Sequence, residues 1–382
     1  MSKAILILTP FFSPNVGGVE THLDDLCKAL IKRGIHVFVL TYQPLASSLK
    51  APAKEVSRNL YVRRLWWFGR KKDMFHKLQN KPLLQFLYLT PYLFLYSFYF
   101  LIRFPQIETI HAMGATGTFI GRFLALVFRK KFIADIETVY NQSILSRYHN
   151  WVLKWILNGA NHIFIPAEVM RPQLIHTYGV PSQKISVFRY WIDQAVFYPR
   201  KDNHEKLFSQ WNNKFIVLFV GRLLEIKGVD LLMEIALQVP QDVLFVVIGE
   251  GTRKEYLRQQ MAHYPNMVFM GPVLNSELRK YYWSADLFIM PSLYEEGFGR
   301  VNMEALACGL PVLASDKKGI REALQEGTGI FVEPTAHNFA RAIVDLKNNP
   351  QKIQIMKQNA NVFTKRFFSE KNIDCFLKVY QS

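Results

Sequence analysis

Cysteine is scarce in this 382-residue chain, and its three cysteines lie far apart, at Cys27, Cys308 and Cys375. Their spacing fits neither a disulfide framework nor a metal-binding motif, so we expect free thiols in a reducing compartment, the cytoplasm. The chain also lacks internal repeats and low-complexity tracts. Its first apolar run, residues 4–8, is too short for a signal peptide, and we expect a buried β-strand there.

Acidic residues are scarce in the first half of the chain only. Residues 1–200 hold 25 Lys plus Arg against 10 Asp plus Glu, whereas residues 201–382 hold 22 against 20. Nearly all of the net charge of +17 therefore belongs to the first half. Such an asymmetry indicates that this half faces a polyanion, either nucleic acid or an anionic membrane.

Short apolar runs alternate with helical patterns throughout the chain, which predicts an α/β protein with two Rossmann-like, doubly wound parallel sheets. The runs expected to be strands are residues 4–8, 35–42, 108–112, 131–135, 162–165, 215–220, 243–248, 267–270, 286–290, 311–314 and 329–332. We expect the domain boundary in the polar stretch within residues 198–213. Because ligands of such sheets bind outside the carboxyl ends of the strands, the crevice between the domains is the expected active site.

Residues 291–311 constrain the function most. Glu296 lies in a glycine-rich loop, and Glu304 lies inside the helix predicted to follow. Gly297 and Gly299 allow the backbone to approach a ligand where the helix N-terminus exposes unpaired amides. Because carboxylates accept hydrogen bonds from hydroxyls and amides bind phosphates, the pattern fits a nucleotide sugar, which carries phosphates between two polyols.

Three other predicted strand ends contribute to the same site. Arg222 and Lys227 stand five positions apart and could hold one diphosphate from two sides. Gly249 and Glu250 follow a second strand, where a ligand could approach the backbone. Val273 follows a third strand and could offer main-chain groups to the edge of a base.

The order of these motifs resembles the retaining glycosyltransferases of family four, which have the GT-B fold. The second half carries Gly-Arg-(x4)-Lys-Gly, Gly-Glu-Gly, Phe-x-Gly-x-Val and Glu-Gly-Phe-Gly-(x4)-Glu, and residues 14–20 resemble the family's N-terminal glycine loop. The resemblance implies an acceptor-binding domain over residues 1–200, a nucleotide-sugar-binding domain over residues 201–364, and a C-terminal stretch, residues 365–382, that packs back on the first domain.

The resemblance also implies a role for each motif residue in a hexosyltransferase-type enzyme with a UDP- or GDP-sugar donor. Arg222 and Lys227 would hold the donor diphosphate, which leaves without an obligatory metal. Glu304 would bind the ribose, and Glu296 would hold the transferred sugar. The remaining donor contacts would come from the backbone of Gly17, Gly18, Gly297, Phe298 and Gly299.

The first half departs from the family pattern at Glu137, because many members carry a histidine near this position. Asp135 and Glu137 could bind donor or acceptor hydroxyls, or they could form a structural strand end. His111 ends a predicted strand facing the same crevice. It could contact a substrate there, or it could be a structural histidine whose hydrogen bonds are satisfied within the protein. The same two alternatives apply to His22.

Residues 54–102 contain the features that indicate what kind of acceptor the protein uses. Residues 54–81 hold nine Lys or Arg against Glu55 and Asp73, and residues 83–102 form an uncharged run as long as a transmembrane helix. A span would place strands of one sheet on opposite sides of a bilayer. The polar-tipped stripe Gln85, Tyr88, Tyr92, Tyr96 and Tyr99 predicts either a buried helix with tyrosines at its solvent edge or an in-plane interfacial helix.

The function predicted from these features is sugar transfer to a glycolipid or lipid-linked saccharide at the inner face of the cell membrane, in cell-surface polysaccharide or glycolipid synthesis. Two alternatives stay open. One is a nucleotide-sugar epimerase or phosphorolytic enzyme of the same fold. The other is a basic nucleic-acid-binding protein, although no nucleic-acid module is recognisable and we expect no nucleic-acid partner.

Overall fold

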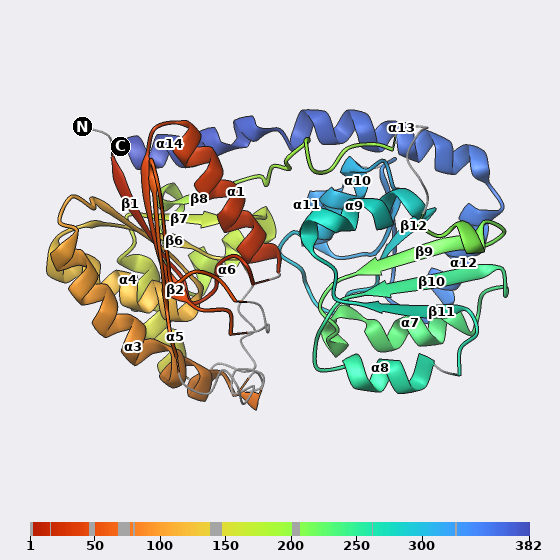
Figure 1. The fold of residues 1–382 in the computed structure, drawn as a ribbon, viewed down its shortest axis with the longest axis horizontal. Coiled ribbons are helices and arrows are strands. Elements are labelled where there is room, and N and C mark those ends of the chain that lie inside the picture. The colour runs from red at the N-terminus through yellow and green to blue at the C-terminus, as the bar shows by residue number, and fades with distance from the viewer. Residues whose placement is uncertain are drawn as a thin grey trace. The chain divides into compact units, whose positions relative to one another are not determined.

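The computed structural model describes residues 3–15, 17–45, 50–67, 77–78, 81–137, 147–200, 207–261, 263–324 and 327–382. Contacts divide the chain into unit 1, residues 1–189 with 371–382, and unit 2, residues 190–370. The ranges predicted from the sequence were 1–200 with 365–382, and 201–364. Figure 1 shows that each unit consists of a sheet with helices on both faces, which confirms the predicted fold class.

The sheet of unit 1 has eight strands in the order β3-β4-β2-β1-β5-β6-β7-β8, and all pairs except β3–β4 are parallel. The strands are β1 Ala4–Leu8, β2 His36–Tyr42, β3 Lys54–Ser57, β4 Leu60–Leu65, β5 Thr109–Met113, β6 Lys131–Asp135, β7 His162–Ile165 and β8 Ile185–Val187. The helices are α1 Gly18–Lys32, α3 Pro82–Arg103, α4 Gly114–Phe128, α5 Arg147–Asn158, α6 Arg171–His176 and α14 Asp374–Gln381. The central strands β1 and β5 are buried along their whole length, as expected of a parallel sheet covered on both faces.

The sequence prediction missed three strands of this sheet, β3, β4 and β8. Strands β3 and β4 form an antiparallel hairpin at the sheet edge, inside the basic stretch of residues 54–81. The residues of β3 are mostly exposed, so this strand has no apolar pattern to reveal it.

The hairpin also changes the interpretation of the basic stretch. Arg64 on β4 is only 4% exposed and donates hydrogen bonds to Glu55 and to the carbonyl of Ser13, both at 2.8 Å. This arginine is therefore a structural residue and not a free surface charge. Residues 68–76, which include three of the nine basic residues, lie outside the described part of the chain.

Helix α3 packs on the core of unit 1 through its tyrosines, whereas one of the two alternatives from the sequence was a buried helix with the tyrosines at its solvent edge. Tyr88, Tyr92 and Tyr96 are half-buried and pack against the core of unit 1; Tyr92 stacks on Trp67 with ring centroids 5.0 Å apart, and Tyr96 accepts a hydrogen bond from Arg63 at 3.0 Å. Only Tyr99 of this stripe is exposed. The tyrosine stripe thus faces the protein, because Trp67 and Arg63 offer ring and hydrogen-bonding partners there. The face that α3 exposes is made largely of leucine.

The sheet of unit 2 has six parallel strands in the order β11-β10-β9-β12-β13-β14. The strands are β9 Phe215–Val220, β10 Val243–Ile248, β11 Met267–Gly271, β12 Leu287–Met290, β13 Val312–Ser315 and β14 Gly329–Val332. The helices are α7 Val229–Ala236, α8 Lys254–Met261, α9 Asn275–Ser284, α10 Arg300–Ala307, α11 Lys318–Ala323, α12 Ala336–Lys347 and α13 Pro350–Phe367. Every strand lies within about one residue of its predicted range.

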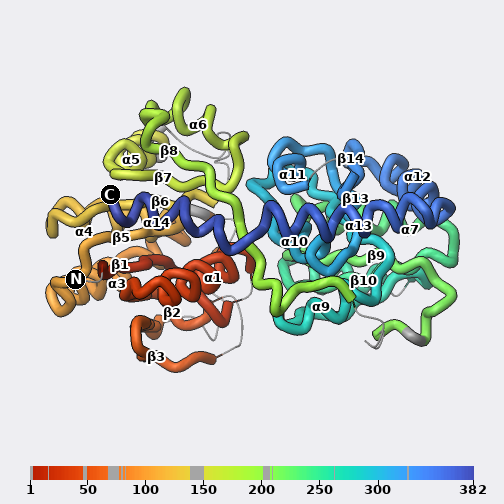
Figure 2. The backbone as a smooth tube through the Cα atoms, turned by 90° about the horizontal axis from the view of Figure 1, so that it is seen from above, coloured from red at the N-terminus to blue at the C-terminus, as the bar shows by residue number. Residues whose placement is uncertain are grey.

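The last helix, α14, belongs to unit 1. Lys3, just before β1, donates hydrogen bonds to the carbonyls of Tyr380 and Gln381, both at 2.8 Å. Figure 2 shows α14 lying beside α1 over the same sheet. Phe376 of α14 is fully buried, with its ring centroid 4.2 Å from that of Phe164 and 5.0 Å from that of Phe188.

These contacts predict that α14 is a structural part of unit 1. A Phe376→Ala substitution should lower the free energy of unfolding by about 3–5 kcal/mol, because it leaves a cavity among aromatic rings. Urea unfolding of the full chain measures this. The control Val362→Ala, at a residue that is 69% exposed on α13, should change stability by less than about 0.5 kcal/mol. Equal stability of the two variants would contradict the prediction.

Candidate functional site

The loops that follow β9, β10 and β11 are joined at the carboxyl edge of the second sheet. The amide of Leu223 donates to the carbonyl of Glu250 at 2.8 Å, and the amide of Gly249 donates to the carbonyl of Gly271 at 3.0 Å. A Cβ atom on Gly249 would lie 1.9 Å from the carbonyl oxygen of Gly221. Glycine is therefore required at this position by the neighbouring loop, whether or not a ligand binds.

Glu296 stands at the centre of a polar cluster on this edge. Its side chain is buried and accepts hydrogen bonds from Ser292 at 2.7 Å and from Tyr294 at 2.9 Å, and it forms an ion pair with Lys227. Lys227 also donates to the Tyr294 hydroxyl at 2.9 Å. The structure thus brings together Lys227 and Glu296, which are 69 positions apart in the sequence.

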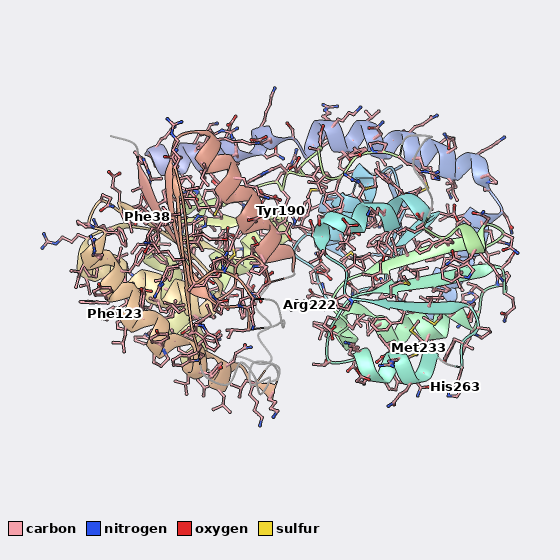
Figure 3. The ribbon with its side chains drawn as sticks, in the orientation of Figure 1. Phe38, Phe123, Tyr190, Arg222, Met233 and His263 are labelled. Atoms are coloured by element: carbon pink, nitrogen blue, oxygen red, sulfur yellow. The ribbon has the colours of Figure 1, made fainter. Side chains whose placement is uncertain are left out.

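The cluster leaves positive charge at the surface. Arg222 is exposed at the carboxyl edge of β9 (Figure 3). Burial lowers the pKa of Lys227; Glu296 opposes this shift, and the charge of Arg222 adds to it. Burial and the charge of Glu296 raise the pKa of Tyr294, so this hydroxyl stays protonated as a donor. An arriving phosphate would stabilise both cations at once.

Glu304 lies in α10, as predicted, and is held by two side chains. Its carboxylate accepts hydrogen bonds from Tyr282 at 3.0 Å and from Asn275 at 3.1 Å, both from α9. It is only 3% exposed. A carboxylate has about four acceptor positions, so it can hold hydrogen bonds from more than one partner, ligand hydroxyls included.

The Gly297-Phe298-Gly299 segment leads into α10. Gly299 has a φ of 77°, a left-handed conformation that favours glycine, and α10 begins at the next residue. The side chain of Phe298 is buried against Tyr190, with ring centroids 5.0 Å apart, so its role within unit 2 is packing. Gly319 of α11 approaches the same loop, because a Cβ there would lie 1.8 Å from the carbonyl oxygen of Glu296.

The two remaining residues predicted for the donor site of unit 2 are Glu250 and Val273. Glu250, in the loop after β10, pairs at 3.0 Å with Lys254, the first residue of α8, and Val273 is half-buried in the loop after β11. Both lie at the carboxyl edge of the sheet, where only their backbone groups were expected to matter.

In unit 1, Gly17 and Gly18 form the start of α1. Gly17 is the residue before the helix, and its carbonyl accepts from the amide and hydroxyl of Thr21 at 3.1 and 2.9 Å. One turn later, His22 is fully buried and stacks on Phe188 with ring centroids 4.9 Å apart.

The residues expected at the carboxyl edge of the first sheet form one buried cluster with His22. Asp135 at the end of β6 has its Oδ2 atom 3.6 Å from His22 Nε2 and 3.4 Å from His111 Nε2. Glu137 Oε1 lies 3.8 Å from His22 Nε2. Burial would raise the pKa of Asp135, but His111 and His22 outweigh it, and the pKa is lowered.

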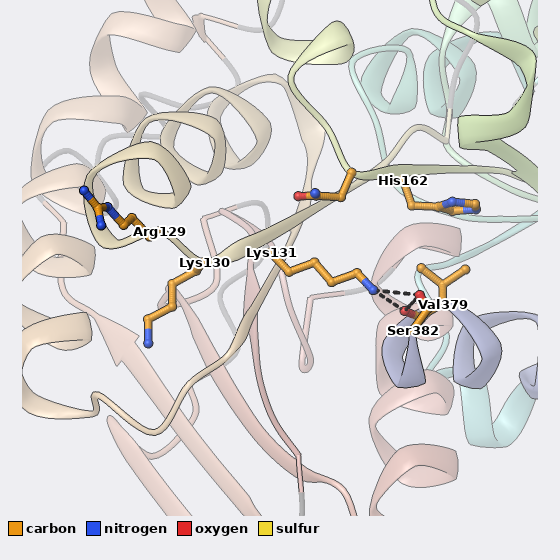
Figure 4. Close-up of a pocket in the computed structure, with 7 residues that line it drawn as sticks. Arg129, Lys130, Lys131, His162, Val379 and Ser382 are labelled. Carbon is orange, nitrogen blue, oxygen red and sulfur yellow. Dashed lines mark hydrogen bonds between the residues drawn. The ribbon is translucent and has the colours of Figure 1, made fainter.

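A pocket elsewhere in unit 1 is not part of this cluster. It opens at the amino ends of β6 and β7, the opposite edge of the sheet from Asp135. Figure 4 shows its lining residues in close-up. Its lining residues are Arg129, Lys130, Lys131, Asn161, His162, Val379 and Ser382. Lys131 there donates to Ser382 at 3.0 Å.

Sequence reasoning missed the residues that hold the two key carboxylates. Ser292 and Tyr294 precede Glu296 within the same motif, but their types gave no signal of a side-chain bond to it. Tyr282 and Asn275 lie on α9, and nothing in their sequence pattern indicated a contact with a carboxylate. Glu295 was also missed; its carboxylate accepts a hydrogen bond from the amide of Gly319 at 2.7 Å, which fixes α11 to the Glu296 loop.

Two parallel α/β units, one of which carries a cationic and a carboxylate cluster at the carboxyl ends of its strands, are the arrangement expected of a glycosyltransferase of the GT-B fold. Residues 16–195 match the model of Glycosyltransferase Family 4, and residues 200–363 match that of Glycosyl transferases group 1. The chain therefore belongs to glycosyltransferase family four. It is an enzyme that uses a nucleotide-sugar donor, and membership favours the transferase over the two alternative functions.

Individual relatives agree with this assignment. The chain is 24% identical over 384 residues to a component of the phosphatidylinositol N-acetylglucosaminyltransferase of Homo sapiens, covering 97% of this chain and 74% of that protein. HepE of Anabaena in complex with UDP-glucose superposes with a TM-score of 0.81 at 20% identity, covering 99% and 100% of the two chains. Sucrose-phosphate synthase of Thermosynechococcus elongatus superposes with a TM-score of 0.84 at 22% identity, covering 100% and 98%. These two superpositions show the fold.

The buried bond to Glu304 predicts a stability effect at Tyr282. Removing the hydroxyl in Tyr282→Phe should lower the free energy of unfolding by about 1.5–3 kcal/mol, because a charged acceptor loses a donor. Burial and Glu304 raise the pKa of Tyr282 well above its ordinary value. The hydroxyl's contribution is therefore present below the unfolded pKa of about 10 and is lost as pH rises toward the folded pKa.

Chemical unfolding at neutral and alkaline pH checks this prediction. The matched control is Tyr281→Phe, because Tyr281 is the neighbouring tyrosine and makes no side-chain hydrogen bond within residues 263–324. A Tyr282→Phe variant as stable as the control at neutral pH would refute the assignment.

Proposed function

We propose that this enzyme transfers a sugar from a UDP-sugar, with retention of anomeric configuration, to a glycolipid or lipid-linked saccharide at the inner face of the cell membrane. The observation that supports a nucleotide-sugar donor site is the Lys227–Glu296–Tyr294 cluster beside the exposed Arg222. The product would serve cell-surface polysaccharide or glycolipid synthesis.

Similar proteins support the choice of UDP and of a lipid acceptor. HepE, a fold relative, was solved with UDP-glucose. The human relative is named for the transfer of N-acetylglucosamine to phosphatidylinositol, a lipid. Both properties belong to those proteins, and we extend them to this chain as part of the proposal.

In this mechanism, Arg222 and Lys227 stabilise the charge that develops on the leaving diphosphate. Lys227 has three donor hydrogens, and among the described residues of unit 2 it uses two of them on Glu296 and Tyr294. The third can reach a phosphate oxygen. No metal is required, since two fixed cations take its place. Glu304 binds the ribose hydroxyls, and Glu296 binds the transferred sugar.

The contacts of Glu296 support a single same-face substitution. A double displacement would need a carboxylate that attacks the anomeric carbon. Both oxygens of Glu296 already accept hydrogen bonds, Oε1 from Ser292 and Oε2 from Tyr294, and Oε1 also pairs with Lys227. This carboxylate is positioned to bind hydroxyls and is a poor nucleophile. In the proposed route, the leaving phosphate therefore helps to deprotonate the acceptor hydroxyl.

The proposal of a lipid acceptor is supported by an exposed apolar surface of unit 1. Helices α3 and α4 lie side by side, with the rings of Phe94 and Phe123 5.1 Å apart and those of Phe98 and Phe128 also 5.1 Å apart. We call their exposed residues the α3–α4 face: Leu84, Leu87, Leu95, Phe98, Ile102, Phe123, Leu126 and Val127. Phe123 on α4 is labelled in Figure 3. Such a contiguous apolar surface is typical of an interaction site.

Basic residues flank the α3–α4 face. Lys81 is exposed just before α3, Arg103 is exposed in its last turn, and Arg129 is exposed directly after α4. Apolar side chains between cations match the profile of a bilayer surface, with acyl chains beneath anionic headgroups. We therefore propose that this face rests in the plane of the inner leaflet.

An in-plane position fits the sheet better than a span. Residues Leu83–Arg103 are long and apolar enough to cross a membrane. However, α3 connects β4 to β5, and both strands belong to the same sheet. A span would separate them, whereas an in-plane helix keeps the sheet intact.

The donor assignment predicts that Arg222→Ala weakens UDP binding by about ten- to a hundredfold, because a charge-assisted hydrogen bond is worth about 1.5–3 kcal/mol. Isothermal titration of the full chain with UDP and UDP-glucose measures the dissociation constants. Arg222 is exposed, so this variant should fold normally. Titration with GDP and GDP-sugars in parallel identifies the preferred base.

The matched control for this experiment is Lys214→Ala. Lys214 lies at the amino end of β9, the same strand that Arg222 follows, and donates only to the carbonyl of Gln241 among the described residues. Its UDP affinity should be that of the unmodified protein. Unchanged UDP affinity in Arg222→Ala would contradict the diphosphate site.

The membrane proposal predicts that Leu95→Glu reduces binding to anionic vesicles by about tenfold or more, because burying leucine is worth about 1.5–3 kcal/mol. Leu95 is 67% exposed at the middle of the α3–α4 face. Flotation with phosphatidylcholine vesicles, with and without phosphatidylglycerol, gives the bound fraction.

The control here is Leu237→Glu on unit 2, at a leucine that is 71% exposed. It should bind vesicles as the unmodified protein does, and binding should fall as salt rises. If the unmodified protein fails to float with anionic vesicles at low salt, the membrane part of the proposal is wrong.

A further inference from the structure

We propose that His22, Asp135 and Glu137 in unit 1 bind one divalent transition-metal ion, with Zn²⁺ as the best-fitting ion. The proposed transfer reaction needs no metal, so this site goes beyond it. Its role is to neutralise two buried carboxylates and to fix the start of α1 to the end of β6.

The distances within the cluster fit a shared ion better than direct hydrogen bonds. One ligand atom from each residue lies within 4.8 Å of the other two. The His22 Nε2 atom is 3.6 Å from Asp135 Oδ2 and 3.8 Å from Glu137 Oε1. Charge-assisted hydrogen bonds are about 2.7–2.9 Å long. Two atoms bound at about 2.0–2.1 Å to one tetrahedral zinc lie about 3.4 Å apart, so the two distances from His22 would need to shorten by only a few tenths of an ångström.

Burial and charge create the need for a cation. Asp135 and His22 are fully buried, and the side chain of Glu137 is 8% exposed. Two carboxylates this close together in a poorly solvated site are costly unless a nearby cation compensates them. Neither oxygen of Asp135 accepts a hydrogen bond of normal geometry from residues that the structure describes. A divalent ion balances both charges.

The surroundings resemble those of bound metals in general. Ligand groups of metal sites are usually held by hydrogen bonds from further residues. Here His111 Nε2 faces Asp135 Oδ2 at 3.4 Å, and the other ring nitrogen of His111 is bonded to the Tyr380 hydroxyl of α14. Phe188 stacks on the His22 ring, and Phe376 packs against it in a tilted arrangement. His111 is thus a positioning residue for Asp135.

The chemical types of the ligand atoms indicate which class of metal ion the site would bind. The site offers one imidazole nitrogen and two carboxylate oxygens, and no thiolate. Imidazole suits zinc, iron, copper and nickel, whereas Mg²⁺ and Ca²⁺ prefer oxygen alone. Three protein ligands leave one position on a tetrahedral zinc for water or a hydroxyl.

The competing explanation is a network without metal, in which His22 and His111 are both protonated and balance the two carboxylates. The two explanations differ in what they bind. A metal site takes up one ion per chain and loses it when a ligand residue changes, while an imidazolium network takes up none.

The test uses the full chain, stripped with a chelator and dialysed against Zn²⁺ or Co²⁺. We expect one bound ion per chain by mass spectrometry of the metal, a visible Co²⁺ absorption band typical of low coordination, and a higher melting temperature with Zn²⁺. Glu137→Gln, at the edge of the cluster, and His22→Gln should lose stoichiometric binding. His111→Gln should weaken Co²⁺ affinity by about 10- to 100-fold, as expected of a residue that orients a ligand.

The matched control is His162→Gln, because His162 lies at the start of β7 and its Nε2 contacts Ser186 at 2.9 Å, away from the cluster. It should bind the ion as the unmodified chain does. Circular dichroism confirms that each variant folds; Glu137→Gln keeps the test decisive if His22→Gln does not fold. An unmodified chain that takes up no Zn²⁺ or Co²⁺, or a binding stoichiometry that Glu137→Gln leaves unchanged, would overturn the proposal.

Discussion

A buried carboxylate must be paired or hydrogen-bonded, and this constraint organises the carboxyl edge of both sheets. In unit 2, Glu296 is held by Lys227, Ser292 and Tyr294, and Glu304 by Tyr282 and Asn275. These partners come from loops and helices that are distant in the sequence. The loops of unit 2 therefore take the positions that a donor site needs because the two carboxylates would otherwise be unsatisfied.

Much of unit 2 could be predicted from its sequence because its signals are local. Apolar runs bounded by glycines mark the strands, and the spacing of Glu296 and Glu304 places one in a loop and the other in a helix. What holds these carboxylates could not be predicted in the same way. Tyr282 and Tyr294 have the composition of ordinary packing residues, and only the tertiary structure shows that their hydroxyls point at carboxylates.

The burial of the tyrosine face of α3 has a specific physical cause. Periodicity identifies the two faces of a helix, but it does not say which of two weakly different faces is buried. One of the two alternatives from the sequence placed the tyrosines at the solvent edge, because their tips are polar. Trp67 offers a ring for stacking and Arg63 a donor for a hydroxyl, so this face is buried on the protein at little cost in unsatisfied groups. The leucine face is then left at the surface.

The last helix links the integrity of unit 1 to the end of the chain. The bond between His111 and Tyr380 spans 269 positions, and Lys3 is held by carbonyls at the same end. Such non-local contacts form late, since a long loop must close before they can contribute. The cluster around Asp135 therefore reaches its final geometry only after the whole of unit 2 has been synthesised. A chain that ends before α14 would leave His111 without its orienting hydroxyl and Asp135 without a correctly placed neighbour, so the carboxyl edge of the first sheet depends on the last eight-residue helix.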